Sequence, residues 1–316
     1  MGKIQIAMVA RPVRRARLAR RTGAALMFGA VAALLTPAVA EPAPQRIVSL
    51  NMCTDQLLLD LVPPDRIAAV SYLGTDATLS AYAKELQPFK KLRGTAEEVL
   101  ALEPDLIIAG EYTTGATVDL LRRVGKNVLI VPMATDFDGM RATVRQIATA
   151  VGEDARGEQV LQHFDDRLRA ARSTVASRPT ALAYQVGSFV SGPESLLDAA
   201  MTAAGYRNLA RELKLGAGGR LPLEQLVTSP PDLLVLANAS DDFRTVLADN
   251  LRHPALQQAM RRRPSVHLPM PYWMCATPKI AEAVEILASM KATGLAHHAP
   301  HHAPHHAPVR AAERPQ

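Results

Sequence analysis

The chain has 316 residues, with 36 lysines and arginines, 30 aspartates and glutamates, and a formal net charge of +6. Seven of the basic residues and none of the acidic ones fall in residues 1–40, so the rest carries 29 basic against 30 acidic side chains. This nearly neutral balance lacks the basic excess that nucleic-acid-binding proteins use, and we expect no nucleic-acid partner.

Residues 1–40 have the features of a signal peptide. An arginine-rich segment ending at Arg20-Arg21 precedes the apolar run Gly23–Leu35, and Ala38-Val39-Ala40 supplies the small residues that signal peptidase recognises. The run is shorter than the roughly 20 residues that cross a bilayer. We therefore expect a soluble, periplasmic protein whose mature chain starts at Glu41, exported by the Sec or the twin-arginine route.

From Arg46 to Val151, short apolar runs alternate with amphipathic stretches. Strands with little polar alternation, separated by helices, are typical of a parallel sheet covered on both faces. Residues 41–152 are therefore predicted to form an α/β lobe. We expect strands at 46–50, 67–70, 105–109 and 127–131, and helices at 55–61, 96–102, 116–124 and 140–151.

A longer helical pattern follows between Asp154 and Ala176, with Leu161, Phe164 and Leu168 on one stripe. Such a helix would be roughly 35 Å long. Pro179 ends it, because proline cannot continue the hydrogen-bonded ladder. Residues 153–178 are therefore predicted to be a linking helix.

The sequence on either side of this helix contains an internal repeat. Arg93–Ala109 matches Arg220–Leu236 at a constant offset of 127, with arginine, glutamate and a Pro-Asp-Leu strand entry in register. A helix followed by Pro-Asp and a strand is also a common junction in α/β proteins. With the linking helix between the copies, we favour two α/β lobes with mainly parallel sheets, joined by a single long backbone helix, with a ligand cleft between the lobes. The second lobe covers 179–293.

Residues 294–316 form a tail rich in histidine and proline, which we expect to be disordered because proline every fourth residue prevents a helix. The tail is either inert or a weak chelator of divalent metals. The candidate metal ligands are His297, His298, His301, His302, His305 and His306.

The chain has two cysteines, Cys53 and Cys275, and no CxxC pair. They could form a disulfide or be two separate, half-buried residues. No motif of a serine hydrolase, a zinc protease or a P-loop NTPase is present. We therefore expect no enzymatic activity and no cofactor.

Aromatic residues gather where predicted strands end. Ligands of open α/β sheets bind beyond the carboxyl ends of the strands, and aromatic faces suit a large, flat or amphipathic ligand. The alternative is that these rings cap the cores. The residues concerned are Tyr72, Tyr112, Tyr184, Phe189, Tyr272 and Trp273.

Four segments resemble the periplasmic solute-binding proteins for vitamin B12 and ferric siderophores: Arg46–Leu58, Pro104–Leu106, Ser188–Ser195 and Trp273–Lys279. The resemblance covers about 44–292 and implies two lobes joined by one rigid helix. It also implies a monomer that captures a metal chelate, a corrinoid such as cobalamin or a ferric siderophore. Asn51, Cys53 and Cys275 join the six aromatics as predicted ligand-binding residues.

The resemblance further implies delivery to an inner-membrane ABC permease and its ATPase. Glu97 and Glu224 match the two surface glutamates, one per lobe, that meet permease arginines in this family. The chain departs from the family at Gly110 and at Gly218-Gly219, where the B12-binding protein has tryptophans.

Two other functions compete with the chelate receptor. Met52-Cys53 and Met274-Cys275 occupy corresponding loops, and thioether plus thiolate favours direct capture of Cu(I). A thiol-dependent redox enzyme could use Cys53 near a helix N-terminus, where the dipole lowers the thiol pKa.

Overall fold

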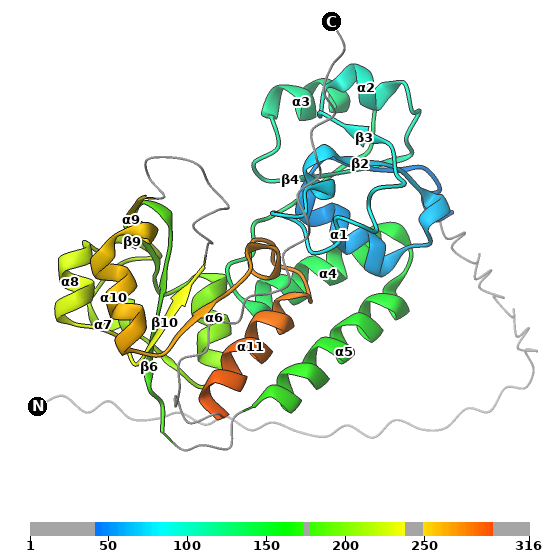
Figure 1. Cartoon of the computed structure of the whole chain (residues 1–316). Coiled ribbons are helices and arrows are strands. Elements are labelled where there is room, and N and C mark those ends of the chain that lie inside the picture. The colour runs from blue at the N-terminus through cyan, green and yellow to red at the C-terminus, as the bar shows by residue number, and fades with distance from the viewer. Residues whose placement is uncertain (1–41, 173–176, 238–248, 293–316) are drawn as a thin grey trace, which may run out of the picture. The chain divides into compact units, whose positions relative to one another are not determined.

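The computed structural model describes residues 42–172, 177–237 and 249–292, which form two α/β lobes and the helix between them (Figure 1). The signal peptide, residues 173–176 and 238–248, and the histidine-rich tail lie outside the described residues. The linking helix ends at Ala171, earlier than predicted, because Arg172 is already extended.

The first lobe is built on a fully parallel five-stranded sheet in the order β3-β2-β1-β4-β5. Its strands are Ile47–Ser49, Ile67–Ser71, Lys91–Leu92, Leu106–Gly110 and Val128–Val131 for β1 to β5. β1 and β4 are almost completely buried, as expected for a sheet covered on both faces. Its helices are α1 (Met52–Leu61), α2 (Ala96–Leu100), α3 (Gly115–Arg123) and α4 (Phe137–Val151), with 3₁₀ turns at Pro64–Arg66 and Tyr72–Thr75.

The second lobe has a mixed sheet in the order β11-β10-β6-β7-β9, with β8 also pairing to β6. Strands β6, β8, β10 and β11 run parallel, whereas β7 and β9 pair antiparallel. Gly218 and Gly219, which depart from the tryptophans of the B12-binding protein, form part of β9. The strands β6 to β11 are Thr180–Tyr184, Phe189–Ser191, Arg207–Asn208, Gly218–Arg220, Leu233–Leu236 and Ser265–His267.

Among the described residues, six helices accompany this second sheet, and the last of them, α11, packs beside α5 (Asp154–Ala171), the linking helix (Figure 1). Arg167 of α5 forms ion pairs with Glu282 and Glu285 of α11 at 3.1 and 2.7 Å. The helices are α6 (Leu196–Ala203), α7 (Leu209–Glu212), α8 (Leu223–Thr228), α9 (Asp249–Arg252), α10 (Pro254–Arg262) and α11 (Ile280–Ala292), with 3₁₀ turns at Val186–Ser188 and Met270–Tyr272.

The largest hydrophobic cluster includes side chains of both lobes and of α5. Phe164 of α5 is fully buried in it, and its ring meets that of Phe137 edge-on at 5.3 Å between centroids. Val284 and Leu287 of α11, in the second lobe, belong to the same cluster. The helix therefore joins the lobes through a shared core as well as through the main chain.

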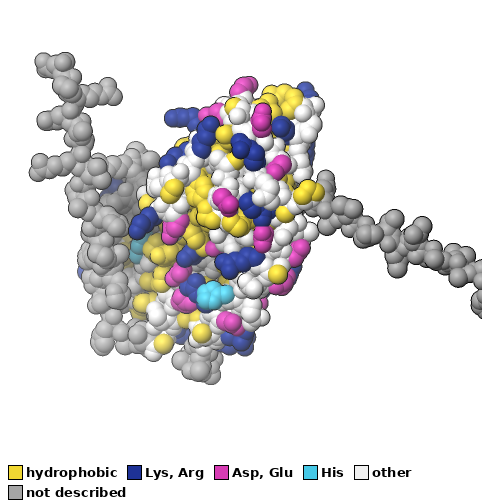
Figure 2. All heavy atoms as spheres, turned by 90° about the vertical axis from the view of Figure 1, so that its right-hand side faces the viewer, with side chains coloured by type: hydrophobic (Ala, Val, Ile, Leu, Met, Phe, Trp, Pro, Cys, Tyr) yellow, Lys and Arg dark blue, Asp and Glu magenta, His cyan; other side chains and the backbone are white. Residues whose placement is uncertain are grey.

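The surface shown in Figure 2 carries interspersed acidic and basic side chains, with apolar side chains between them. No large patch of one sign appears on this face, which agrees with the neutral balance of the sequence after residue 40. Within the described part of the chain, none of the helices has the length and apolar character to cross a membrane.

We predict that Phe164→Ala lowers the free energy of unfolding by about 3–5 kcal/mol, because it leaves a cavity in the core shared by both lobes. The adjacent His163 is exposed on the same helix, so His163→Ala should change stability by less than about 0.5 kcal/mol. Urea unfolding followed by circular dichroism measures both. Equal losses in the two variants would contradict the shared core.

Candidate ligand-binding site

A cavity of about 520 Å³ lies between the lobes and is lined by both. Most of its wall is apolar, as in typical small-molecule sites. The first lobe contributes Asn51, Cys53, Thr54, Leu57, Gly110, Glu111, Tyr112, Val131, Pro132, Met133, Ala134, Thr135 and Thr143. The second contributes Ser191, Glu194, Ser195, Leu196, Leu197, Ala217, Gly218, Trp273, Met274 and Ala276.

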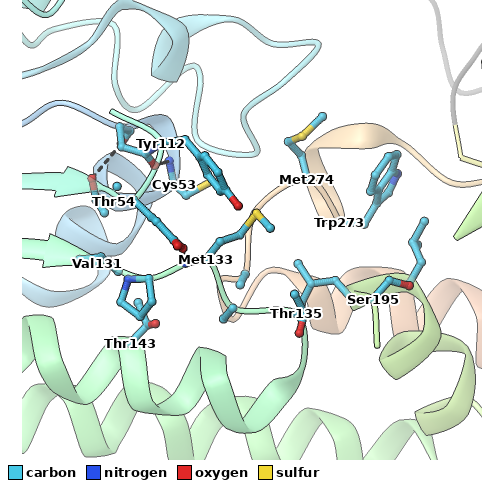
Figure 3. A pocket seen from close by; sticks show the side chains of 18 of the residues that line it. Cys53, Thr54, Tyr112, Val131, Met133, Thr135, Thr143, Ser195, Trp273 and Met274 are labelled. Atoms are coloured by element: carbon cyan, nitrogen blue, oxygen red, sulfur yellow. Dashed lines mark hydrogen bonds between the residues drawn. The ribbon is translucent and has the colours of Figure 1, made fainter. Parts of the chain in front are cut away.

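The first-lobe wall is formed where strands end and helices begin. Asn51 follows β1 and caps α1, since its side chain accepts a hydrogen bond from the Cys53 backbone N–H at 2.9 Å. Tyr112 follows β4, Met133 follows β5, and these two side chains are 75% and 59% exposed. Both extend towards the loop that carries Met274 and Trp273 (Figure 3). This wall thus presents an aromatic ring and a thioether to a ligand.

The second-lobe wall comes from the start of α6 and from the loop before α11. Ser195 caps α6 by accepting a hydrogen bond from the Asp198 backbone N–H at 3.2 Å. Trp273 is half-buried, and its indole N–H donates to the Leu268 carbonyl at 3.3 Å. Glu194 has a φ of 63°, a left-handed conformation that is uncommon for residues other than glycine.

A close backbone approach shapes the same wall. Gly192 donates its N–H to the Ala217 carbonyl at 3.1 Å, which places the 215–217 segment directly against it. A Cβ on Gly192 would lie 1.6 Å from the carbonyl oxygen of Gly216. Only glycine fits there, because any side chain would push this segment away from the cavity wall that Ala217 and Gly218 form.

Cys53 and Cys275 form a disulfide that joins the start of α1 to the loop before α11. The described residues contain no free cysteine. The disulfide argues against the two competing functions. Both the Cu(I) site and the redox enzyme require a thiolate, and neither sulfur is free to be one. It also decides between a cross-link and two separate cysteines.

Formal charge at the cavity comes from two carboxylates, one on each lobe. Glu111 accepts a hydrogen bond from the Met133 backbone N–H at 3.1 Å, and Glu194 is exposed. None of the described lining residues is lysine, arginine or histidine. Behind the wall, burial raises the pKa of Asp55 well above its usual range, and hydrogen bonds from Ser49 and the Ser71 backbone N–H oppose the rise.

The structure places four of the predicted ligand-binding residues in the cavity lining: Asn51, Cys53, Tyr112 and Trp273. The prediction for Tyr184 needs correction. Its ring is fully buried in the second-lobe core, and its hydroxyl donates to Ser188 at 2.9 Å. Cys275 is also buried and reaches the site only through the disulfide. Outside the lining lie Tyr72, Phe189 and Tyr272.

Sequence reasoning missed several lining residues, among them Met133, Thr135, Thr143, Glu111 and Glu194. Thr143 is the least expected, because it lies on α4 and is nearly buried. Its hydroxyl makes no hydrogen bond within the described structure. The end of β5 was a usable signal for Met133 and Thr135, since the carboxyl ends of parallel strands share one edge of the sheet.

The other predicted residues lie away from this cavity. Glu97 and Glu224 are exposed, each at the second position of its helix, α2 and α8. The six tail histidines lie outside the described residues. Among those described, no group of three or more histidine, cysteine, aspartate or glutamate side chains is placed to hold a metal ion.

Two α/β lobes joined by one long helix, with a cavity between them lined by both, define a solute-binding protein of the class III periplasmic type. Comparison with known families agrees: residues 47–266 match the periplasmic binding protein family. The chain belongs to this family of extracytoplasmic receptors, which bind their solutes without enzymatic chemistry.

Two curated relatives each match only part of this chain. The cobalamin-binding protein of Halobacterium salinarum is 27% identical over 203 residues, 63% of this chain and 55% of that protein. The chain thus spans about half the length of this curated relative. The uncharacterised ABC transporter substrate-binding lipoprotein YvrC of Bacillus subtilis is 25% identical over 129 residues, 40% of each chain.

Solved structures show the same fold. The periplasmic heme-binding protein RhuT from Roseiflexus sp. RS-1 superposes with a TM-score of 0.67 and 23% identity, over 80% of this chain and 99% of that one. The vitamin B12 binding protein BtuF of Vibrio cholerae gives a TM-score of 0.58 and 16% identity, over 78% and 96%.

We predict that Gly192→Ala destabilises the protein by about 1–3 kcal/mol, because the added methyl group overlaps the Gly216 carbonyl and displaces the 215–217 segment. Gly216→Ala is the matched control: a Cβ there meets nothing within 4 Å. Thermal unfolding of both variants tests the close approach, and a Gly192→Ala variant as stable as Gly216→Ala would disprove it.

Proposed function

We propose that this protein is the receptor of an ABC importer that captures a metal chelate of the corrinoid or ferric-siderophore type in the periplasm. The observation that carries the proposal is the cavity between the lobes, where Tyr112 and Met133 of the first lobe face Trp273 and Met274 of the second. Such a wall suits a large ligand with apolar faces and polar edges. The relatives named for cobalamin and heme support this ligand class.

Charge favours a neutral or cationic chelate. The lining carries two carboxylates, Glu111 and Glu194, without a basic side chain among its described residues. At the starts of α1 and α6, the caps Asn51 and Ser195 each accept one backbone N–H, from Cys53 and Asp198, and the two carboxylates carry the only formal charge among the described lining residues. Like charges disfavour binding, so a corrinoid bearing neutral amides fits this wall better than an anionic ferric chelate or a heme with two propionates.

Polar anchors for such a ligand are present. The buried hydroxyl of Thr143 has no partner within the described structure, and the Tyr112 hydroxyl extends into the cavity. An unpaired buried hydroxyl is unfavourable, so a ligand amide that bonds to Thr143 would gain affinity. The cavity thus combines apolar contact area with a small number of polar groups, as ligand sites usually do.

We predict that neutral and cationic chelates stabilise the protein in a thermal-shift panel and that anionic ones do not. The panel contains cyanocobalamin, cobinamide and ferrioxamine B, against heme and a ferric triscatecholate. A ligand at 100 times its Kd adds about 2.7 kcal/mol of stability. Stabilisation by the triscatecholate alone would reverse the charge argument, and no stabilisation by any of the five would contradict the receptor function.

A pair of aromatic variants tests which residues touch the ligand. Trp273→Ala should weaken binding of the strongest chelate by roughly 1–3 kcal/mol, because the ring forms part of the cavity wall. Phe189→Ala should leave affinity unchanged, since that ring is 43% exposed and lies outside the lining. Isothermal titration measures both affinities. The opposite pattern would place the ligand beside Phe189 and not beside Trp273.

The docking surface proposed for the permease centres on Glu97 and Glu224. Both carboxylates are exposed and make no hydrogen bond or ion pair within the described residues. Four residues before each glutamate is an arginine stacked on an exposed ring: Arg93 over Tyr72 at 6.0 Å and Arg220 over Phe189 at 4.6 Å. The arginine and the glutamate follow the repeat of 127 residues, and a ring lies beside the arginine on each lobe, which supports docking to two similar permease surfaces.

Glu98 provides the control for this proposal, because it caps α2. Its carboxylate accepts hydrogen bonds from the backbone N–H groups of Arg93, Gly94 and Thr95. Glu97→Lys with Glu224→Lys should keep ligand affinity and stability while slowing salt-dependent association with the permease and reducing transport in vesicles. Glu98→Ala should lose about 1 kcal/mol of stability and transport normally. Normal transport by the double variant would defeat the docking proposal.

The histidine-rich tail remains a separate proposal. Its six histidines would bind divalent metals weakly and independently of the cavity, since imidazole is a common ligand of zinc, copper and nickel.

A further inference from the structure

The disulfide connects the two walls of the cavity directly. Cys53 belongs to the first lobe and itself lines the cavity, whereas Cys275 belongs to the second lobe and is only 2% exposed. Their Cα atoms lie 5.2 Å apart although 222 residues separate them in sequence. The main chain passes from the first lobe to the second through α5, and the disulfide adds a second covalent connection at the ligand site.

The residues next to Cys275 form the opposite wall. Trp273 and Met274 immediately precede the cysteine and line the cavity, facing Tyr112 and Met133 (Figure 3). Any movement of this loop away from α1 would widen the cavity between these side chains. The disulfide limits that movement to what its own rotations allow.

Two noncovalent contacts also join the lobes, one of them at the disulfide itself. The buried Gln56 side chain of α1 donates to the Cys275 sulfur at 3.4 Å. Lys279, just before α11, has its ammonium group 4.9 Å from the centroid of the Tyr82 ring of the first lobe. Each of these contacts can break and re-form as the lobes move, but the covalent bond cannot.

We propose that the Cys53–Cys275 disulfide sets the aperture of the cleft, holding the Trp273–Met274 loop against the first lobe so that the cavity keeps its shape without ligand. The two cysteines are thus positioning residues for the binding site. Their importance for affinity rests on the proposed receptor function, whereas the effect on the aperture does not.

The expected size of the effect follows from the populations of open and binding-competent states. If the lobes without the cross-link spend one-tenth of the time at the competent aperture, the apparent Kd rises about tenfold. A preformed cavity avoids this loss, because the ordering of the loop is completed before the ligand arrives.

The chain's only tryptophan makes the test direct, since Trp273 lies two residues from Cys275. We would compare the wild type with Cys53→Ala/Cys275→Ala and Cys53→Ser/Cys275→Ser, all without ligand. Leu256→Ala is the matched control: it lowers stability through the second-lobe core and leaves the cross-link in place. Wild type reduced with a phosphine, which converts the disulfide to two thiols, gives a measurement that requires no variant to fold.

Loss of the cross-link should shift Trp273 emission to longer wavelength, raise its acrylamide quenching constant about twofold and speed hydrogen exchange in residues 270–279. Far-UV circular dichroism should stay unchanged, and Leu256→Ala should resemble the wild type in all three measurements. Emission intensity is not compared, because a disulfide itself quenches a nearby indole. Unchanged emission, quenching and exchange in both double variants and in the reduced wild type would overturn the proposal.

A second experiment measures affinity with cobinamide as the probe. We expect cobinamide to bind each double variant about tenfold more weakly than the wild type, with Leu256→Ala unaffected. Equal affinity in all of them would overturn the link between aperture and binding. A wild type that binds no chelate would defeat the proposed function alone, because the ligand-free fluorescence would still decide whether the disulfide sets the aperture.

Discussion

A single hydrophobic cluster shared by both lobes is the constraint on which the rest of the structure depends. Side chains of α1 and α4 from the first lobe, of α5, and of α6 and α11 from the second lobe all belong to this cluster. Separating the lobes would expose this apolar surface to water, which costs roughly 25 cal/mol for each Å². The shared core therefore keeps the two sheets joined, and their strand ends can build a common cavity.

Much of this architecture was predictable because it follows from local patterns. The apolar runs at Ile47–Ser49 and Leu106–Gly110 are buried strands of a parallel sheet, as their lack of alternation indicates. The linking helix also followed from its stripe of Leu161 and Phe164, both of which are buried. The two antiparallel strands β7 and β9 were not predicted, because two strands of three residues carry too little periodicity to recognise.

The candidate site was predicted less completely, for reasons visible in individual residues. Both Tyr112 and Tyr184 end a strand region, but Tyr112 is 75% exposed whereas Tyr184 turns into the core and bonds to Ser188. Sequence position fixes the strand end, and only tertiary packing fixes the direction of the ring. Thr143 shows that sequence can also miss a site residue. A threonine inside an amphipathic helix gives no sign that it borders a cavity.

The span of the disulfide also has a consequence for how the protein is made. Because Cys53 and Cys275 are 222 residues apart, Cys53 is made together with the first lobe, and its partner is made only after nearly all of the second lobe. The disulfide can therefore form only after both walls of the cleft have been synthesised. Because Cys53 and Cys275 are the chain's two cysteines, an oxidant acting before Cys275 has been made could join Cys53 only to a thiol of another molecule.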